Sequence, residues 1–376
     1  MSLFNLQNVD KTIVAFDKEE QKVYYYVLGN VKEPYVFRIS EETILYQAFL
    51  AWKNKLFFFN DFGQIDYWDS YEMKSLRSVD QKMAAQFVLT ITDAILLQNR
   101  YLVVVVGKHP SYKDPNVSLE IYDLETHFSI KYPYQIPVKN FESLILFEMP
   151  NHLGLNFSVG EIQLFSIEKL LKGDWNPSSG EKMLSPILVR GSFEFVFNTQ
   201  LTSKGTFFLD NSNYEKQNSA MYFLSEKDVS LCPFFVRDKP LANFSYDDLY
   251  YDEGMELLIL MDSETEKIAF FQQENDEFHF LARCYNTCVN EGECKIIGDI
   301  FVTLRNWGDG VVNVRQYLIP FLTLGKLLAA GLTPEENLDG ENSEFFSFLT
   351  KGLYDPRLFC LIFAFVDVDF IKIEKH

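Results

Sequence analysis

The sequence predicts an all-β fold in which one strand pair is repeated to build a closed ring. Strand-forming residues are abundant, since the 376 residues include 36 Phe and 20 Tyr, and aromatic side chains suit the half-buried surface of a sheet. An apolar strand, a tight polar turn and an alternating strand recur together along the chain. Their recurrence at roughly forty to sixty residues is close to the period of four-stranded blades. We therefore expect a single closed β-propeller.

The clearest copy of the strand pair runs from Lys55 to Asp69. Its turn contains Asn60, Asp61 and Gly63, residue types that suit tight turns. Asp61-Phe62-Gly63 also matches the metal-binding tripeptide of protein kinases. The chain has neither the glycine-rich loop nor the His-Arg-Asp catalytic loop that should accompany that tripeptide. We therefore interpret this segment as a hairpin turn.

The other copies follow when the middle of each second strand serves as an anchor. The seven anchors are Tyr25, Tyr67, Ile121, Leu164, Phe223, Phe270 and Val314. Continuous apolar runs at 101–106, 257–261 and 300–304 precede three of them, as expected for strands buried on both faces. Segments 35–39, 129–133 and 278–282 are predicted to be outer strands. Polar insertions at 108–116 and 211–218 lengthen two of the repeats and predict loops.

The two ends of the chain predict how the ring closes. A capping pattern begins at Thr333, and residues 344–351 before Gly352 predict a short helix. Residues 325–354 are therefore expected to form a helical or loop insertion before a hairpin at 358–374. Pairing of 1–40 with 355–376 would leave no open sheet edge. With six blades between the ends, this gives seven blades in one domain spanning 1–376, and eight is the alternative if each end forms its own blade.

The Trp68-Asp69 ending resembles the end of a repeat in WD40-type β-propellers, and Tyr122-Asp123 is a degenerate second copy. The Gly-His dipeptide that typically opens such repeats is absent. The resemblance covers the rhythm of residues 11–320 and one copy of the motif. It implies a non-catalytic platform for protein–protein interaction, acting as a scaffold or structural subunit of a larger intracellular assembly.

The charge of the chain limits its partners. The formal net charge is −19, which argues against direct nucleic-acid binding and against anionic membrane surfaces. It permits protein subunits with basic surfaces. The candidate partner face lies in an acidic segment and consists of Asp247, Asp248, Asp252, Glu253 and Glu256. Solvated loops around a buried strand, or a calcium site without EF-hand spacing, are the alternatives for this segment.

No catalytic, cofactor-binding or metal-binding motif is found in the sequence. Cys284, Cys288 and Cys294 do not have the spacing of a zinc knuckle, and whether they bind anything stays open. The alternative function is a glycosidase-like or lyase-like propeller enzyme with carboxylates at its axial channel. A lipid-binding propeller is a third interpretation. It would need a basic cluster, which Arg190 and Arg283 do not supply.

The compartment follows from what the sequence lacks. The amino terminus has no basic segment followed by an apolar run, as a signal peptide would have. The longest apolar stretch, residues 358–366, is too short to span a bilayer. We expect a soluble intracellular protein, and the sequence does not distinguish the cytoplasm from the nucleus or name the partners or pathway.

Overall fold

The computed structural model describes most of the chain up to residue 318 and two residues near its end. The described residues are 6–9, 12–18, 20–27, 35–39, 46–60, 63–69, 72–78, 89–108, 116–126, 129–137, 144–172, 186–193, 196–210, 220–234, 248–254, 256–262, 267–274, 277–285, 292–297, 300–306, 312–318 and 371–372. They belong to two compact units. The first holds Met1–Tyr26, Pro34–Ser212 and Ala220–Pro233, and the second holds Val27–Glu33, Asn213–Ser219 and Phe234–His376.

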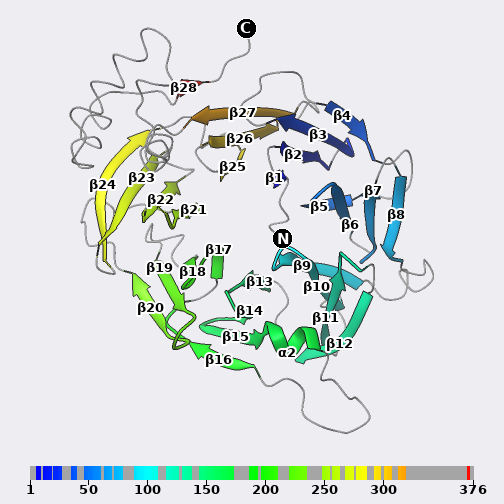
Figure 1. Cartoon of the computed structure of the whole chain (residues 1–376), viewed down its shortest axis with the longest axis horizontal. Coiled ribbons are helices and arrows are strands. Elements are labelled where there is room, and N and C mark those ends of the chain that lie inside the picture. Colours follow the sequence, from blue (N-terminus) through cyan, green and yellow to red (C-terminus); the bar gives the residue numbers. More distant parts are fainter. Residues whose placement is uncertain are drawn as a thin grey trace. The chain divides into compact units, whose positions relative to one another are not determined.

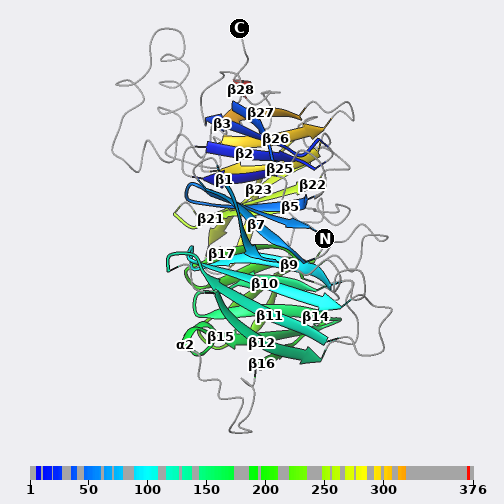
Figure 2. The ribbon, with the colours of Figure 1, turned by 90° about the vertical axis from the view of Figure 1, so that its right-hand side faces the viewer.

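The first unit contains five antiparallel sheets of four strands, each sheet ordered as in the chain (Figure 1). The first two sheets are β1 (Leu6–Val9), β2 (Thr12–Asp17), β3 (Lys22–Val27) and β4 (Tyr35–Arg38), then β5 (Tyr46–Trp52), β6 (Lys55–Asn60), β7 (Ile65–Asp69) and β8 (Glu72–Arg77). The third is β9 (Leu89–Leu97), β10 (Tyr101–Lys108), β11 (Asn116–Asp123) and β12 (Ser129–Pro137). Figure 2 shows the strands of this third sheet from the side.

The last two sheets of the first unit follow the same plan. They are β13 (Ile145–Glu148), β14 (His152–Ser158), β15 (Glu161–Ser166) and β16 (Ile187–Arg190), then β17 (Val196–Thr202), β18 (Gly205–Asp210), β19 (Ala220–Ser225) and β20 (Leu231–Phe234). A short helix, α2 (Ile167–Lys172), follows β15 directly and buries Ile167 and Leu170. This helix was not predicted from the sequence.

The second unit contains two described sheets. One is β21 (Asp248–Asp252), β22 (Leu257–Asp262), β23 (Lys267–Glu274) and β24 (Glu277–Tyr285), and the other is β25 (Gly292–Ile297), β26 (Ile300–Asn306), β27 (Val312–Leu318) and β28 (Ile371–Lys372). In all seven sheets of the described residues, the third strand carries one of the seven sequence anchors. The strand rhythm predicted from the sequence is therefore confirmed. The predicted outer strands at 35–39, 129–133 and 278–282 also correspond to the fourth strands β4, β12 and β24.

The ring closure predicted from the chain ends stays a prediction. β1 to β4 form a four-stranded sheet from residues 6–38 alone, and Ile371 and Lys372 pair with Leu318 and Tyr317 of β27. The rest of 355–376 lies outside the described residues, as do the predicted insertion at 325–354 and its helix at 344–351. The number of blades and the extent of the domain stay predictions as well.

The core of the first unit lies between neighbouring sheets. β10 shows the principle, because Leu102, Val104 and Val106 pack into the cluster shared with the β5–β8 sheet, while Val103 and Val105 pack into the cluster shared with the β13–β16 sheet. All five side chains are buried. A strand covered on both faces needs apolar residues at every position, which explains why this segment lacks the alternation of the strands around it.

Among the described residues, no helix combines the length and the apolar character that a bilayer crossing requires.

Candidate interaction surfaces

Hydrogen bonds from side chains to main chains connect each sheet of the first unit to the next. The five side chains involved are Gln21, Trp52, Asp93, Asn156 and Thr206. Gln21 shows the pattern, since its amide both accepts from Tyr46 N–H and donates to Tyr46 O, each at 2.9 Å. A buried polar group needs such a partner to offset its lost hydration. These polar side chains therefore fix the junctions between sheets.

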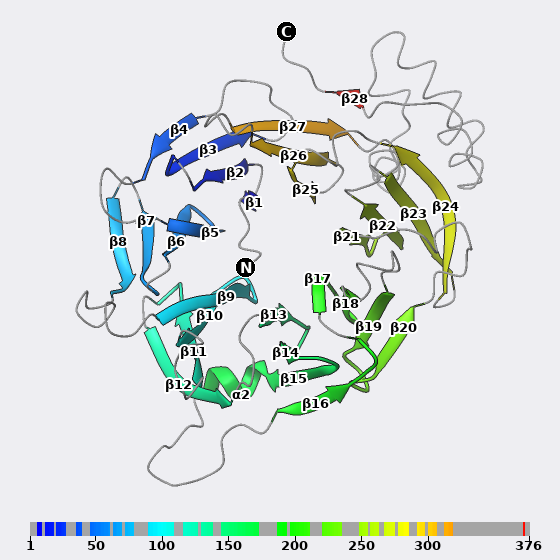
Figure 3. The same cartoon turned by 180° about the vertical axis from the view of Figure 1, so that it is seen from behind.

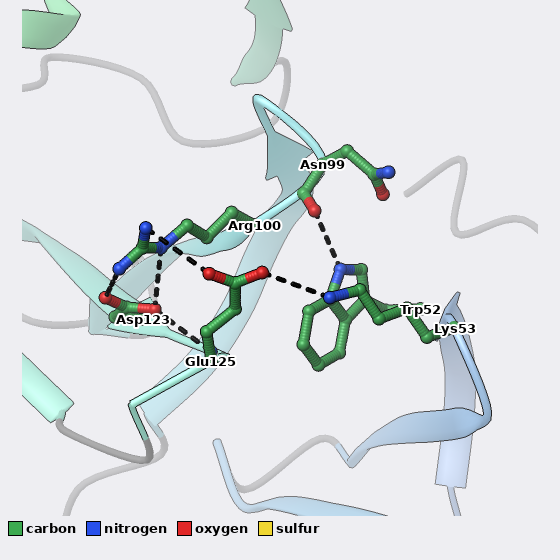
Figure 4. Close-up of polar contacts among 6 residues, drawn as sticks. All are labelled: Trp52, Lys53, Asn99, Arg100, Asp123 and Glu125. Carbon is green, nitrogen blue, oxygen red and sulfur yellow. Dashed lines mark hydrogen bonds and ion pairs between the residues drawn. The ribbon is translucent and has the colours of Figure 1, made fainter.

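A cluster of turn residues joins the β5–β8 sheet to the β9–β12 sheet (Figure 4). The indole nitrogen of Trp52 donates to Asn99 O at 2.8 Å, and the Lys53 ammonium lies 4.4 Å from the Trp52 ring centroid. Lys53 also pairs with Glu125 at 3.1 Å. Because the Lys53 and Glu125 side chains are about half exposed, their ion pair contributes little to stability. The Trp52 side chain is buried, so water competes less with its bond than with the exposed ion pair.

Arg100 completes this turn cluster. Its Nε and terminal nitrogen donate to the two oxygens of Asp123 at 3.0 and 2.5 Å, and it also contacts Glu125 at 3.3 Å. The hydrogen bond from Arg100 lowers the pKa of Asp123 to about 2. The cluster thus neutralises its own charges, and nothing in its geometry holds a nucleophile beside a base.

A second contact between the same two sheets is more deeply buried. Arg77 of β8 donates to Glu120 of β11 from Nε at 2.9 Å and from a terminal nitrogen at 3.2 Å. The Tyr122 hydroxyl donates to the same carboxylate, and Arg77 also donates to the Gly63 carbonyl. Burial and the adjacent carboxylate raise the pKa of Tyr122 above its ordinary value. This two-bond contact orients both groups.

Asp93 of β9 is the described carboxylate whose pKa is raised furthest. Its two oxygens accept from Leu146 N–H and Ala94 N–H, at 2.8 and 2.9 Å. Loss of hydration inside the protein raises the pKa of Asp93 to about 7. The hydrogen bonds from the two backbone N–H groups favour the charged form and oppose this rise. The side chain nevertheless keeps some solvent contact. Such a group is a candidate for acid–base chemistry, but structural carboxylates are perturbed in the same way.

The structure brings together only part of the acidic face predicted from the sequence. Asp247 lies outside the described residues. Asp252, Glu253 and Glu256 lie at the β21–β22 turn, where burial and then these carboxylates raise the pKa of Tyr251 to about 12. Asp248 begins β21, at the opposite end of a strand whose five residues span roughly 13 Å.

The three clustered cysteines lie where no side chain is described. Cys284 and Cys294 belong to β24 and β25, and Cys288 lies outside the described residues. Among the side chains that are described, no group of three or more His, Cys, Asp or Glu residues could hold a metal ion. The described free thiol is the exposed Cys232 on β20.

Exposed apolar side chains concentrate on two edge strands, β4, which was predicted as an outer strand, and β16, which was not. The described residues include six large exposed apolar side chains: Tyr35, Val36, Val159, Ile187, Leu188 and Leu201. Four of them belong to β4 and β16, the fourth strands of their sheets. The missed signal was a run of three apolar residues in each of these outer strands, with a single arginine at the end, where charged or proline residues usually protect an edge.

Comparison with known proteins supports the fold without naming a family. No family model and no curated protein matches the chain. The chain is similar to a functionally unknown protein from Desulfotomaculum acetoxidans, with a TM-score of 0.53 and 8% identity over 83% of this chain and 93% of that chain. It is also similar to an oligogalacturonate lyase in complex with manganese, with a TM-score of 0.53 and 10% identity over 84% and 96% of the two chains.

The β-propeller domain of Cps50 (Swd1) from Myceliophteria thermophila gives a TM-score of 0.48 and 14% identity over 70% of this chain and 81% of that domain. The two structures with a TM-score of 0.53 share the fold of this chain, and identities this low carry no information about activity. The chain thus has an all-β fold of four-stranded antiparallel sheets, the unit from which propeller blades are made.

Proposed function

We propose that the protein is a non-catalytic interaction platform, a scaffold or structural subunit of a larger assembly, built as one closed β-propeller over residues 1–376. The observation that carries this proposal is the exposure of Tyr35, Val36, Ile187 and Leu188 on two sheet edges. Monomeric proteins usually protect such edges, because an exposed apolar strand pairs with other chains. A partner protein that covers them would remove this liability.

The polar residues support the same proposal. Five side chains of the first unit form hydrogen bonds from one sheet to the backbone of the next, which holds neighbouring sheets in fixed positions. A rigid frame presents a surface without the entropic cost of ordering it on binding. The acidic face predicted from the sequence, Asp247, Asp248, Asp252, Glu253 and Glu256, stays a proposal for a second surface. The carboxylates at the β21–β22 turn, Asp252, Glu253 and Glu256, are the part of it that would meet a basic partner together.

Purification of the tagged full chain from its native source tests the platform. We expect it to elute in a complex with other proteins, identified by mass spectrometry and sized by light scattering. The double substitution Val36→Lys and Leu188→Lys should release at least one partner. Ser75→Lys on the exposed face of the already charged strand β8 is the matched control. A strictly monomeric, partner-free protein would contradict the proposal.

Asp93 supports a second candidate function, an enzyme with a carboxylate on the inner, first strand of a blade. Its raised pKa of about 7 suits a general acid or base near neutral pH. Incubation with oligogalacturonate and Mn²⁺ tests it, because the similar lyase acts on the first and is in complex with the second. Formation of shorter uronates that disappears in Asp93→Asn would favour the enzyme, and no turnover would leave the platform as the better proposal.

A further inference from the structure

β4 and β16 present the same pattern at their free edges. Each is a four-residue strand with three apolar residues followed by arginine, Tyr-Val-Phe-Arg38 and Ile-Leu-Val-Arg190. Each is the fourth strand of its sheet, as Figure 3 shows for β16 beside β15. The fourth strands of the other three sheets in the first unit have charged residues or prolines along their length. β8 carries Glu72, Lys74 and Arg77, while β12 and β20 contain prolines.

The register shows which backbone groups of these two strands face outward. Ile39 N–H donates inward to Gln21 O at 2.9 Å, and Gly191 N–H donates inward to Gly160 O at 3.0 Å. Antiparallel pairing alternates inward and outward positions. The N–H and C=O groups one and three residues earlier therefore point away from the sheet. They belong to Val36 and Arg38 in β4, and to Leu188 and Arg190 in β16.

The side chains divide in the same way. Phe37 stacks on Trp68 of the next sheet with ring centroids 4.9 Å apart, and Val189 packs into the core shared with the β17–β20 sheet. Side chains alternate between the two faces of a strand. Val36 and Arg38, like Leu188 and Arg190, therefore project from the opposite face. Val36 is 43% and Leu188 48% exposed, and both arginines are exposed as well.

The charges at these edges favour a carboxylate on an added strand. Arg38 is directly opposite Lys22 of β3, and like charges in that position repel, although Lys22 also contacts Glu20. The Arg190 side chain is 74% exposed and meets Glu161 through Nε alone, at 3.4 Å. Guanidinium groups bind carboxylates best through two nitrogens, and an incoming acidic side chain could supply that contact at both strands.

We propose that β4 and β16 each accept an extended segment of a partner protein as a fifth, antiparallel strand. The segment carries Asp or Glu two residues before a branched apolar residue. The carboxylate lies opposite Arg38 or Arg190, and the apolar residue lies opposite Val36 or Leu188. The proposed direction is antiparallel, the direction in which neighbouring strands of both sheets already pair. Main-chain bonds give affinity and the alternate side chains give specificity. This inference rests on the proposed interaction platform and names the chemistry of its partner.

Selection of displayed random decapeptides on the full-length protein tests the inference. We expect enrichment of acidic–x–branched-apolar sequences. Val36→Pro with Leu188→Pro removes two outward N–H groups without touching an inward bond, and should weaken the Kd of an enriched peptide at least tenfold. Val36→Thr with Leu188→Thr keeps the N–H groups and is the matched control. Arg38→Glu with Arg190→Glu should change the selected residue from acidic to basic.

The results separate the failure of this inference from failure of the platform. Enriched peptides that bind the proline variant with unchanged Kd, or enrichment of no such sequence, would overturn strand addition at these edges. A concentration-dependent dimer that the proline variant abolishes would identify a second copy of the chain as the occupant and overturn it too. Co-purified native partners would keep the platform standing in each case, whereas their absence would remove the platform itself.

Discussion

Arg77 and Lys53 form ion pairs of the same chemical kind in very different surroundings. The Arg77–Glu120 side chains are 11% and 12% exposed, whereas those of Lys53 and Glu125 are 52% and 44% exposed. Removing one partner from a buried pair leaves an uncompensated charge. Burial, rather than distance, therefore decides which of the two pairs matters for stability.

Arg77→Ala is expected to lower the free energy of unfolding by about 3 to 5 kcal/mol, because Glu120 would remain buried and charged. Lys53→Ala should cost less than about 1 kcal/mol. Urea denaturation at pH 7 measures both. Adding Glu120→Gln to Arg77→Ala should recover part of the loss by removing the orphaned charge. Equal losses for the two single variants would show that the buried pair is not special.

Asp93 is expected to make stability fall as the pH rises. Its pKa is about 7 in the folded protein and near 4 when unfolded, so the folded state binds more protons between these values. The stabilisation is complete below about pH 4 and is lost as the pH passes 7. Each pKa unit corresponds to about 1.4 kcal/mol, which gives a loss on the order of 2 to 4 kcal/mol.

Urea unfolding from pH 4 to pH 8 measures this dependence. Asp93→Asn lacks the titrating proton and should have a flatter profile, crossing that of the wild type as the pH rises. The carboxamide oxygen can still accept from Leu146 N–H, which preserves the junction between β9 and β13. Parallel profiles for the two proteins would refute the assignment of this titration to Asp93.

At the scale of elements, the turn between β9 and β10 is strained by its sequence. Gln98 and Asn99 both have positive φ, at 50° and 49°, and Arg100 N–H donates to Leu97 O. This is a type I′ turn, which prefers Asn-Gly at its two central positions. Asn tolerates the left-handed region, whereas Gln does so at a cost.

Gln98→Asn is expected to raise the free energy of unfolding by about 0.5 to 1 kcal/mol, since the backbone would adopt its φ more easily. The bond from Gln98 N–H to Glu148 involves the main chain and is retained. Gln98→Ala is the control, because it shortens the side chain without favouring positive φ. Thermal unfolding compares the three proteins, and a stabilised alanine variant would point to the side chain instead of the turn.

Much of the element pattern could be predicted because strand alternation is local. All seven anchors fall on third strands of the described sheets. α2 escaped prediction because its six residues provide only two buried positions, Ile167 and Leu170, too few to establish a helical period. The inter-sheet ties and the outward groups of β4 and β16 also escaped it. Both depend on strand register and on which backbone atoms of a neighbouring sheet come close. Every residue has the same backbone atoms, so the sequence does not reveal these contacts.

At the scale of the whole molecule, closure of the ring makes a calorimetric prediction. If residues 1–40 and 355–376 close one propeller, deletion of 355–376 should lower the temperature of a single cooperative transition for the entire protein, because an open edge weakens every stacked sheet in turn. Differential scanning calorimetry of the full and truncated chains measures this. Two separate transitions, with only one affected by the deletion, would contradict a single closed domain.

The ties between sheets have a consequence for how far this sequence can drift. In each tie one partner is a main-chain atom, as with Tyr46, Asn99, Leu146 and Val196. A backbone atom is present whatever residue occupies the position. Each of these hydrogen bonds therefore depends on the identity of one residue, whereas a bond between two side chains depends on two. A chain joined in this way can keep its architecture while the side chains at Tyr46, Asn99, Leu146 and Val196 change.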